Sequence, residues 1–254
     1  AKPKIDVADQ LKEYADEIIE KVRMAATAKV QPLRKRKEIS KSKVAEKLST
    51  DAVLNRSQAK KHFKTTDKII GIGSSTGGTE AVKDVLAGLP ADMPGIVITQ
   101  HIPAAFSRSF ADRANTITPL TVVEARDRQQ ILAGHVYIAP GDKHLIVKRD
   151  GARYICSLND GPAVNRHKPS VDVMFRSLAD NAGANAIAVM LTGMGDDGAA
   201  GTGEMKEQGA PVIAQDERSS VVWGMPGEVV KRGFADDVLP LSKIAARLID
   251  LANR

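Results

Sequence analysis

The feature that most constrains this chain is a pattern in which short apolar runs end in chemically reactive polar residues. Short apolar runs that alternate with amphipathic stretches are typical of the strands and helices of an α/β sheet. Three of these runs, with the polar residues that follow them, are 68–73 with Ser75 and Thr76, 95–99 with His101, and 186–191 with Asp197. Because the carboxyl ends of parallel strands lie side by side, we expect a serine, a histidine and a carboxylate to converge at one edge of the sheet. Such a set of groups predicts a serine hydrolase.

The alternation of strands and helices begins at residue 67. A strand, an amphipathic helix and a second strand follow one another at 69–72, 79–89 and 96–99, which is a βαβ unit with parallel strands. The pair Asp150 and Gly151 predicts a hairpin turn, so we expect an antiparallel hairpin beside a mainly parallel sheet. The other predicted strands are 120–124, 136–139, 145–148, 153–158, 186–191 and 211–214, with 136–139 grouped among the antiparallel ones, and the other predicted helices are 107–114, 170–181, 201–208 and 241–251.

The first third of the chain has a different character. Apolar residues at spacings of three and four predict one amphipathic helix over residues 7–26. Residues 1–68 carry a net charge of +8 and the rest of the chain −2, and the densest basic run is 34–43. Such a run can attract nucleic acid or an acidic membrane surface. No aromatic platform or DNA-binding motif accompanies it, so we favour a solvated basic linker over residues 31–66 and expect no nucleic-acid partner.

Composition excludes several classes of protein. A chain of 254 residues with 43% hydrophobic residues can build a sizeable core. No apolar stretch approaches the roughly 20 residues that cross a bilayer, and the start lacks the pattern of a secretion signal. We therefore expect a cytoplasmic protein without membrane insertion. Cys156 is the only cysteine, which excludes an internal disulfide and a cysteine-rich metal site, and we expect it to fill a small buried apolar position.

The loop at residues 73–78, Gly-Ser-Ser-Thr-Gly-Gly, has three interpretations. A phosphate-binding loop would need lysine where Thr79 stands, and a dinucleotide fingerprint counted from Gly71 would need glycine where Thr76 stands. The glycines can also serve only a tight turn between a strand and a helix. Taken alone, the loop does not decide among these. A serine hydroxyl at a helix N-terminus does, however, gain from the positive end of the helix dipole.

A nucleophilic hydroxyl needs a base, and His101 is the candidate because it lies just beyond a predicted inner strand. We expect the other histidines that follow no such strand, His62, His135 and His144, to be structural. The loop at residues 192–198 offers glycine-supported backbone amides together with the Asp196–Asp197 pair. Metal binding by the two carboxylates is the competing interpretation, but no third hard ligand lies near them in the sequence, so we expect no metal or other cofactor.

Six ordered stretches also resemble the catalytic domain of the chemotaxis protein-glutamate methylesterase family, CheB. They are residues 73–78, 98–101, 137–142, 160–167, 191–198 and 224–226. The resemblance runs in order from about residue 67 to 251. It implies a three-layer α/β/α domain with a doubly wound, mainly parallel sheet. It further implies an enzyme that hydrolyses glutamate methyl esters on chemoreceptors with release of methanol, and often deamidates selected receptor glutamines.

Carried over position by position, the resemblance makes Ser75 the nucleophile, His101 the base and Asp197 the residue that orients the histidine. It suggests Thr76 as a support for the histidine and the Met194 amide as an oxyanion donor. In the family-like loops, the candidate walls of a substrate cleft are Arg166, His167, Met225 and Met194, although each of these side chains could instead pack against its neighbours.

Three positions depart from the family's usual residues. Ser74 stands where alanine is common, and the register of residues 76–78 selects Ser75 as the nucleophile. Asp196 stands where asparagine is frequent, and the loop alignment selects Asp197. Arg128 occupies a position often held by glycine, which concerns only a local turn.

Family architecture also bears on the first residues. The catalytic domain of the family normally follows a receiver domain, whose last strand ends near a Lys-Pro pair before its final helix. Lys2, Pro3 and the helix after them fit that ending. We therefore expect residues 1–30 to be the last helix of a receiver domain, 31–66 a linker and 67–254 the catalytic domain. The expected partners are the helical bundle of a methylated chemoreceptor and a receiver domain of the same protein. The alternatives are a hydrolase of small carboxylic esters and a noncatalytic phosphate- or nucleotide-binding domain.

Overall fold

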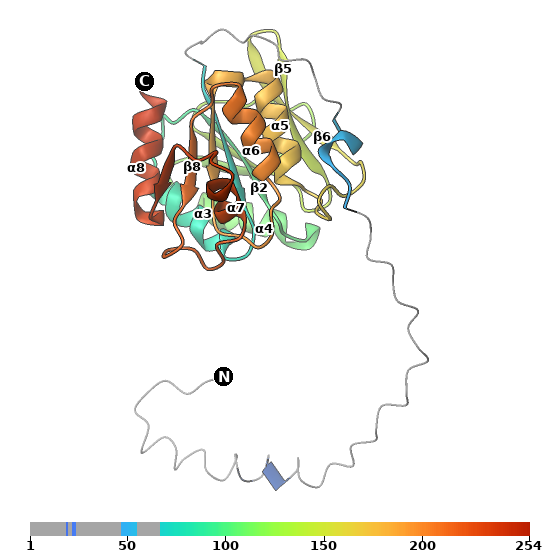
Figure 1. The fold of residues 1–254 in the computed structure, drawn as a ribbon, viewed down its shortest axis with the longest axis vertical. Helices are drawn as coiled ribbons and strands as arrows, with labels where there is room; N and C mark the ends of the chain where they lie inside the picture. Colours follow the sequence, from blue (N-terminus) through green and yellow to red (C-terminus); the bar gives the residue numbers. More distant parts are fainter. Residues whose placement is uncertain (1–18, 20–21, 24–46, 55–66) are drawn as a thin grey trace. The chain divides into compact units, whose positions relative to one another are not determined.

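The computed structural model describes residues 19, 22, 23, 47–54 and 67–254. The chain divides into two compact units, Ala1–Val44 and Ala45–Arg254. In the first unit the three described residues are helical, and the rest of the predicted helix at 7–26 lies outside the described residues. The second unit is the α/β body shown in Figure 1. Among the described residues, none of the helices combines the length and apolar character needed to span a membrane.

The main sheet has seven strands in the order β3-β4-β2-β1-β7-β8-β9, and every neighbouring pair is parallel. The central strands are buried along their whole length, as expected for a parallel sheet covered on both faces. The strands are Ile69–Ser74 (β1), Gly95–Gln100 (β2), Thr121–Glu124 (β3), His135–Ile138 (β4), Ala186–Met190 (β7), Val212–Gln215 (β8) and Asp237–Leu239 (β9).

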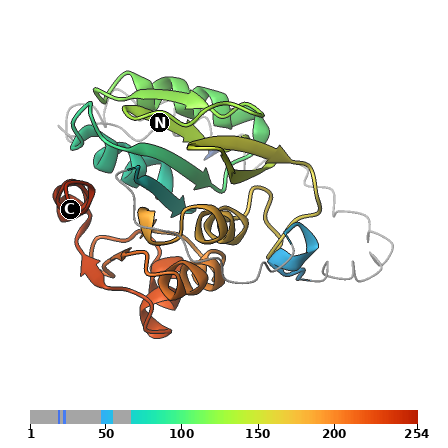
Figure 2. The same cartoon turned by 90° about the horizontal axis from the view of Figure 1, so that it is seen from above.

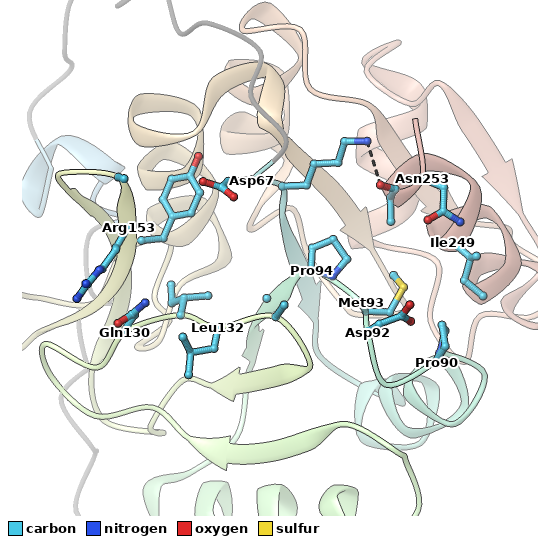
Figure 3. A pocket seen from close by; sticks show the side chains of 17 residues that line it. Asp67, Pro90, Asp92, Met93, Pro94, Gln130, Leu132, Arg153, Ile249 and Asn253 are labelled. Carbon is cyan, nitrogen blue, oxygen red and sulfur yellow. Dashed lines mark hydrogen bonds between the residues drawn. The ribbon is translucent and has the colours of Figure 1, made fainter.

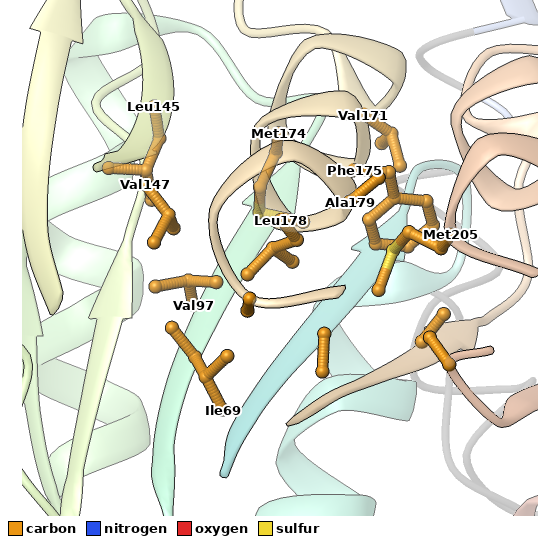
Figure 4. Close-up of a cluster of buried hydrophobic side chains, with 14 of the residues drawn as sticks. Ile69, Val97, Leu145, Val147, Val171, Met174, Phe175, Leu178, Ala179 and Met205 are labelled. Carbon is orange, nitrogen blue, oxygen red and sulfur yellow. The ribbon is translucent and has the colours of Figure 1, made fainter. Parts of the chain in front are cut away.

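Helices cover both faces of this sheet, so the predicted three-layer α/β/α fold is confirmed (Figure 2). Along β1, Ile69 packs on one face while Ile70 and Ile72 pack on the other, the two-residue alternation of a strand. The helices are Gly78–Ala87 (α3), Ala104–Asn115 (α4), Val171–Asn181 (α5), Ala199–Glu207 (α6), Met225–Lys231 (α7) and Leu241–Ala252 (α8). Residues of α3, α4 and α8 share one core, and residues of α5, α6 and α7 share the other (Figure 4).

The hairpin lies outside the main sheet. His144–Asp150 (β5) and Arg153–Asn159 (β6) pair antiparallel around Gly151, whose φ of 59° suits the predicted turn. The grouping of 136–139 with this hairpin is wrong, because β4 lies between β2 and β3 and is parallel to both. The burial of residues 136–138 agrees with this inner position. Cys156 in β6 is fully buried in the core beneath the hairpin, and burial raises the pKa of its thiol to about 12, so its predicted apolar role is confirmed.

Residues 47–54, which belong to the predicted linker, contact the α/β body. The short 3₁₀ helix Thr50–Ala52 (η1) places Asp51 against Arg176 of α5, with 2.5 Å between Oδ1 and Nη1. Val53 and Leu54 pack against a small apolar cluster of the body. An ion pair and partial apolar burial therefore hold this segment against the body.

A cavity of about 800 Å³ opens at the end of the sheet where β1 and β2 begin (Figure 3). Lys68, just before β1, lines it and donates hydrogen bonds through Nζ to the Leu251 and Ala252 carbonyls, at 2.8 and 3.1 Å. The lysine thereby satisfies carbonyls at the end of α8, a role that basic side chains often take at helix C-termini. Ser75 and His101 follow the opposite ends of the same two strands, so this cavity lies away from them.

Candidate active site

Three loops at the carboxyl edge of the sheet meet at Ser75. The parallel register pairs Ser74 with Gln100, so Ser75 and His101 leave adjacent strands at the same level, and the His101 amide donates to the Ser74 carbonyl at 3.1 Å. The Ser75 amide donates to the Thr192 carbonyl at 3.0 Å. A Cβ placed on Gly193 would lie 2.8 Å from the Ser75 Cβ. The loop that carries Asp197 is therefore packed directly against Ser75.

The two adjacent serines occupy different environments. Ser74 is fully buried, and its hydroxyl donates to Gln100 Oε1 at 2.7 Å. Ser75 is half-buried, and it precedes the left-handed Gly77 (φ 80°) that starts α3. Gln100 Nε2 donates to the Ser75 carbonyl at 2.8 Å, which holds the serine's backbone in place. Only the Ser75 hydroxyl is therefore placed to meet a substrate from solvent.

His101 and Asp197 are in direct contact. His101 Nε2 lies 2.8 Å from Asp197 Oδ2, and the two side chains are 8% and 1% exposed. Because a carboxylate only accepts hydrogen bonds, Nε2 carries the proton of the neutral ring. His101 Nδ1 is then the free acceptor, and it is buried with no hydrogen-bond partner among the described residues. An unpartnered basic nitrogen of this kind is what a general base requires.

The Asp197 side chain, which precedes α6 in the sequence, lies against the N-terminus of α5. Its Oδ1 accepts from Asn165 Nδ2 at 2.8 Å and from the Ser170 hydroxyl at 2.7 Å, and its Oδ2 accepts from the Val171 amide at 2.7 Å as well as from His101. Burial alone would raise the pKa of this carboxyl, but the hydrogen bonds from His101, Asn165 and Ser170 lower it below its ordinary value. Asp197 is therefore held as a carboxylate beside the histidine.

The residues that support Asp197 were not predicted as site residues. Asn165 belongs to a family-like stretch, but nothing in its spacing connects it with Asp197, 32 positions away. Ser170 occupies the N-cap position of α5, yet its hydroxyl makes no capping hydrogen bond and donates to Asp197 instead. Asp172 is buried next to Asn165 and Ser170. Burial first, and then the charge of Asp197, raises the pKa of Asp172. The sequence did contain one signal for these residues, because Ser170 and Asp172 are polar side chains at the start of the helix predicted at 170–181.

The other predicted site residues lie in different environments around the triad. The His167 ring stacks on the His101 ring, with 3.7 Å between centroids, and burial followed by the His101 charge lowers its pKa. Thr76 is exposed and its side chain makes no hydrogen bond to His101 in the described part of the chain, so the predicted support comes from the His167 ring instead. Met225 is fully buried under Gly193, so it supports the loop and cannot form an open cleft wall. Arg166 is exposed, at a φ of 69°.

The loop at residues 192–198 presents Met194 to solvent, with a side chain 68% exposed. Within the described residues the Met194 amide donates to no acceptor, which leaves it available to a substrate oxygen. Asp196 points elsewhere and forms ion pairs with Lys47 at 2.6 Å and Arg232 at 3.8 Å. The two adjacent carboxylates are thus engaged by separate partners, and in the described residues no group of three metal-ligand side chains surrounds them.

The sequence matches a family model described as CheB methylesterase over residues 70–248. The chain belongs to the CheB methylesterase family. It is 52% identical to a protein-glutamate methylesterase/protein-glutamine glutaminase of Hydrogenovibrio crunogenus, over 100% of this chain and 72% of the relative. It is 53% identical to a protein with the same name, numbered 1, from Xanthomonas euvesicatoria, over 99% of this chain and 69% of the relative.

The fold also matches a solved member of the CheB family. The crystal structure of the Thermotoga maritima CheB methylesterase catalytic domain superposes with a TM-score of 0.71 and 42% sequence identity, covering 72% of this chain and 98% of that one. Fold and family, both predicted by the resemblance, are therefore confirmed. Membership in this family also identifies the chain as a hydrolase.

Proposed function

We propose that this protein is a serine hydrolase that demethylates glutamate methyl esters on chemoreceptors, with Ser75, His101 and Asp197 as its catalytic triad. The observation that carries the proposal is the state of His101. One ring nitrogen is bonded to a buried carboxylate and the other, also buried, has no partner within the described residues. The half-buried Ser75 follows the neighbouring strand at the same level of the sheet. A carboxylate, a histidine base and a serine nucleophile in this sequence of contacts are the groups that serine hydrolases use for acyl transfer.

The reaction proceeds by acyl transfer to serine. His101 Nδ1 accepts the Ser75 proton as the hydroxyl oxygen attacks the ester carbonyl, and the Asp197 carboxylate stabilises the positive ring. The Met194 amide donates to the oxygen that becomes negative in the tetrahedral intermediate. His101 then protonates the departing methoxide, which leaves as methanol. Water, deprotonated by the same nitrogen, attacks the acyl-enzyme and releases the glutamate carboxylate and Ser75.

The same groups suit an amide substrate. The tetrahedral intermediate of a glutamine side chain would lose ammonia in place of methanol, with His101 again supplying the proton to the leaving group. The names of the relatives, which include protein-glutamine glutaminase, support this second activity. The proposed mechanism uses no metal or organic cofactor.

We further propose that the substrate is the cytoplasmic helical bundle of a methylated receptor and that a receiver domain of the same protein controls access. Met194 at 68% exposure and the exposed Arg166 lie on loops that also carry site residues, and they are candidate contacts for such a helix together with His167. We accordingly propose a cytoplasmic location for the protein.

The substrate class can be tested directly. Methanol and ammonia release should be measured with methylated receptor membranes and, in parallel, with simple methyl esters at equal ester concentration. We expect turnover of the receptor ester to exceed that of the small esters. Faster turnover of small esters would favour the general esterase. Nucleotide binding in calorimetry without any hydrolysis would favour a noncatalytic phosphate-binding domain.

A further inference from the structure

A buried polar network behind the triad is not used by the mechanism above. At its centre, Asn165 Nδ2 donates to Asp197 Oδ1 at 2.8 Å and to Asp172 Oδ2 at 2.5 Å. The two carboxylates are 1% and 3% exposed, so neither is solvated by bulk water. One amide group therefore lies between two buried carboxyl groups, which is a position that few side chains other than asparagine can fill.

Asn165 is itself held from two sides. Its backbone amide donates to the Leu48 carbonyl at 2.9 Å, in the segment that precedes the catalytic body. The carboxylate that accepts from its side chain, Asp172, also accepts from the Gly201 amide at 2.7 Å and is thereby tied to the start of α6. The backbone of Asn165 has a φ of 51°, a left-handed conformation that asparagine and glycine tolerate better than other residues.

We propose that Asn165 is a positioning residue for the reaction and that it fixes the orientation of the Asp197 carboxylate. The inference deepens the proposed function and rests on it. Asp197 Oδ1 accepts from Asn165, from the Ser170 hydroxyl and, at 3.4 Å, from the Asp172 amide, while Oδ2 accepts from His101 and the Val171 amide. These five donors determine the plane of the carboxylate and, through the His101 bond, the direction of the histidine ring, and Asn165 and Ser170 are the side chains among them that approach Oδ1. Without Asn165, the carboxylate can rotate and the free ring nitrogen moves with it.

The same contacts connect the segment 47–54 to the triad through one residue. A displacement of Leu48 acts on the Asn165 backbone, and the Asn165 side chain acts on Asp197. The neighbouring contact between Lys47 and Asp196, at 2.6 Å, reaches the same loop. The linker segment is thus part of the support of the active site.

The test compares two substitutions that each place glycine at a left-handed, non-glycine position. Asn165→Gly removes the amide and keeps the backbone conformation free of strain. Arg128→Gly is the matched control, since Arg128 is exposed, has a φ of 62° and lies in a turn bonded to Cys156. Removal of a residue that orients a metal-bound histidine costs about 10- to 100-fold in function, and we expect a loss of kcat of about that size for Asn165→Gly. KM should change by less than about twofold, because substrate contacts are intact.

A second readout needs no substrate. The proton shared by His101 Nε2 and Asp197 should give a downfield proton resonance in the NMR spectrum of wild type and of Arg128→Gly, and Asn165→Gly should shift or lose it. If wild type shows this resonance but releases no methanol, the proposed function fails and the resonance still decides the role of Asn165. Wild-type kcat together with an unchanged resonance in Asn165→Gly would overturn the inference.

A further variant separates positioning from folding. Asn165→Ala also removes the donor and places no third carboxyl group beside Asp172 and Asp197, with backbone strain at the left-handed position. We expect it to lose kcat as the glycine variant does while a thermal melt still shows a cooperative transition. If both variants unfold, Asn165 supports the fold and not the reaction, and the proposal is wrong.

Discussion

Replacement of Gly193 by alanine should damage catalysis through the position of Ser75. A Cβ at this residue would lie 2.8 Å from the Ser75 Cβ and 3.1 Å from the Ser75 amide nitrogen, and closer still to the buried Met225 sulfur. Ordinary contacts of a Cβ begin at 3.4 Å, so relief of the contact with Ser75 needs a movement of about 0.6 Å, and relief of the contact with the Met225 sulfur needs a larger one. The loop resists, because the Gly193 amide donates to Val222 and its carbonyl accepts from Gly224 and Met225.

Ser75 is bonded to Gln100 and to Thr192, so Ser75 and the loop share the shift. Misplacement by about 1 Å can cost 100-fold in rate, so we expect kcat to fall by roughly 10- to 100-fold. Overpacking should also lower the free energy of unfolding by about 1 to 3 kcal/mol. Methanol release from methylated receptor membranes measures the first effect and urea denaturation the second.

Gly209→Ala is the matched control for this substitution. Gly209 has a φ of 82°, and a Cβ there would meet only the Ala184 Cβ, at 3.6 Å. This change costs about 1 kcal/mol of backbone strain at a site outside the three loops, and kcat should stay at the wild-type value. A Gly193→Ala enzyme with wild-type kcat would refute the contact between the loop and the nucleophile.

Two further predictions concern stability. Arg176 is 7% exposed and is paired with Glu204 at 2.6 Å, but Asp51 stays paired with it, so Glu204→Gln should destabilise the protein by about 1 to 2 kcal/mol in urea denaturation. The exposed Glu207→Gln should change the stability by less than about 0.5 kcal/mol, and equal effects would contradict the pairing. Burial and the Asp197 charge raise the pKa of Asp172 to about 7 from 3.8, so the folded state binds a proton that the unfolded chain releases, and stability falls as pH rises through 7. Asp172→Asn removes this ionisation, so its stability relative to wild type should rise between about pH 4 and 7 and stay level above about pH 8; a difference that is constant from pH 4 to 8 would show that Asp172 does not titrate there.

The main features of the fold could be predicted because burial and periodicity are local properties of the sequence. The runs that became β1, β2 and β7 are continuous and apolar, as inner parallel strands require. Pairing partners are not local, which is why β4 was placed with the hairpin although it lies between β2 and β3. The short helix α7 and the three-residue strand β9 were missed, since each is too short for a periodic pattern.

In the site, too, the residues that follow predicted strands could be predicted, whereas the residues that support them could not. Ser75, His101 and Asp197 follow strands, so topology alone brought them to one edge. Their support could not be predicted, because Asn165 reaches Asp197 from a loop with two consecutive left-handed residues, at φ of 51° and 69°. The contact of Lys47 with a carboxylate 149 positions away could not be predicted either, because nothing local in the sequence connects the two.

The central claim is that Ser75 gives up its proton to His101, and replacement of each of the two adjacent serines tests it most directly. Methanol release from methylated receptor membranes should be abolished in Ser75→Ala. Ser74→Ala should retain most of the activity and lose only about 1 to 3 kcal/mol of stability, because it leaves the buried Gln100 oxygen without the Ser74 donor. Abolished release in Ser74→Ala together with retained release in Ser75→Ala would contradict the account.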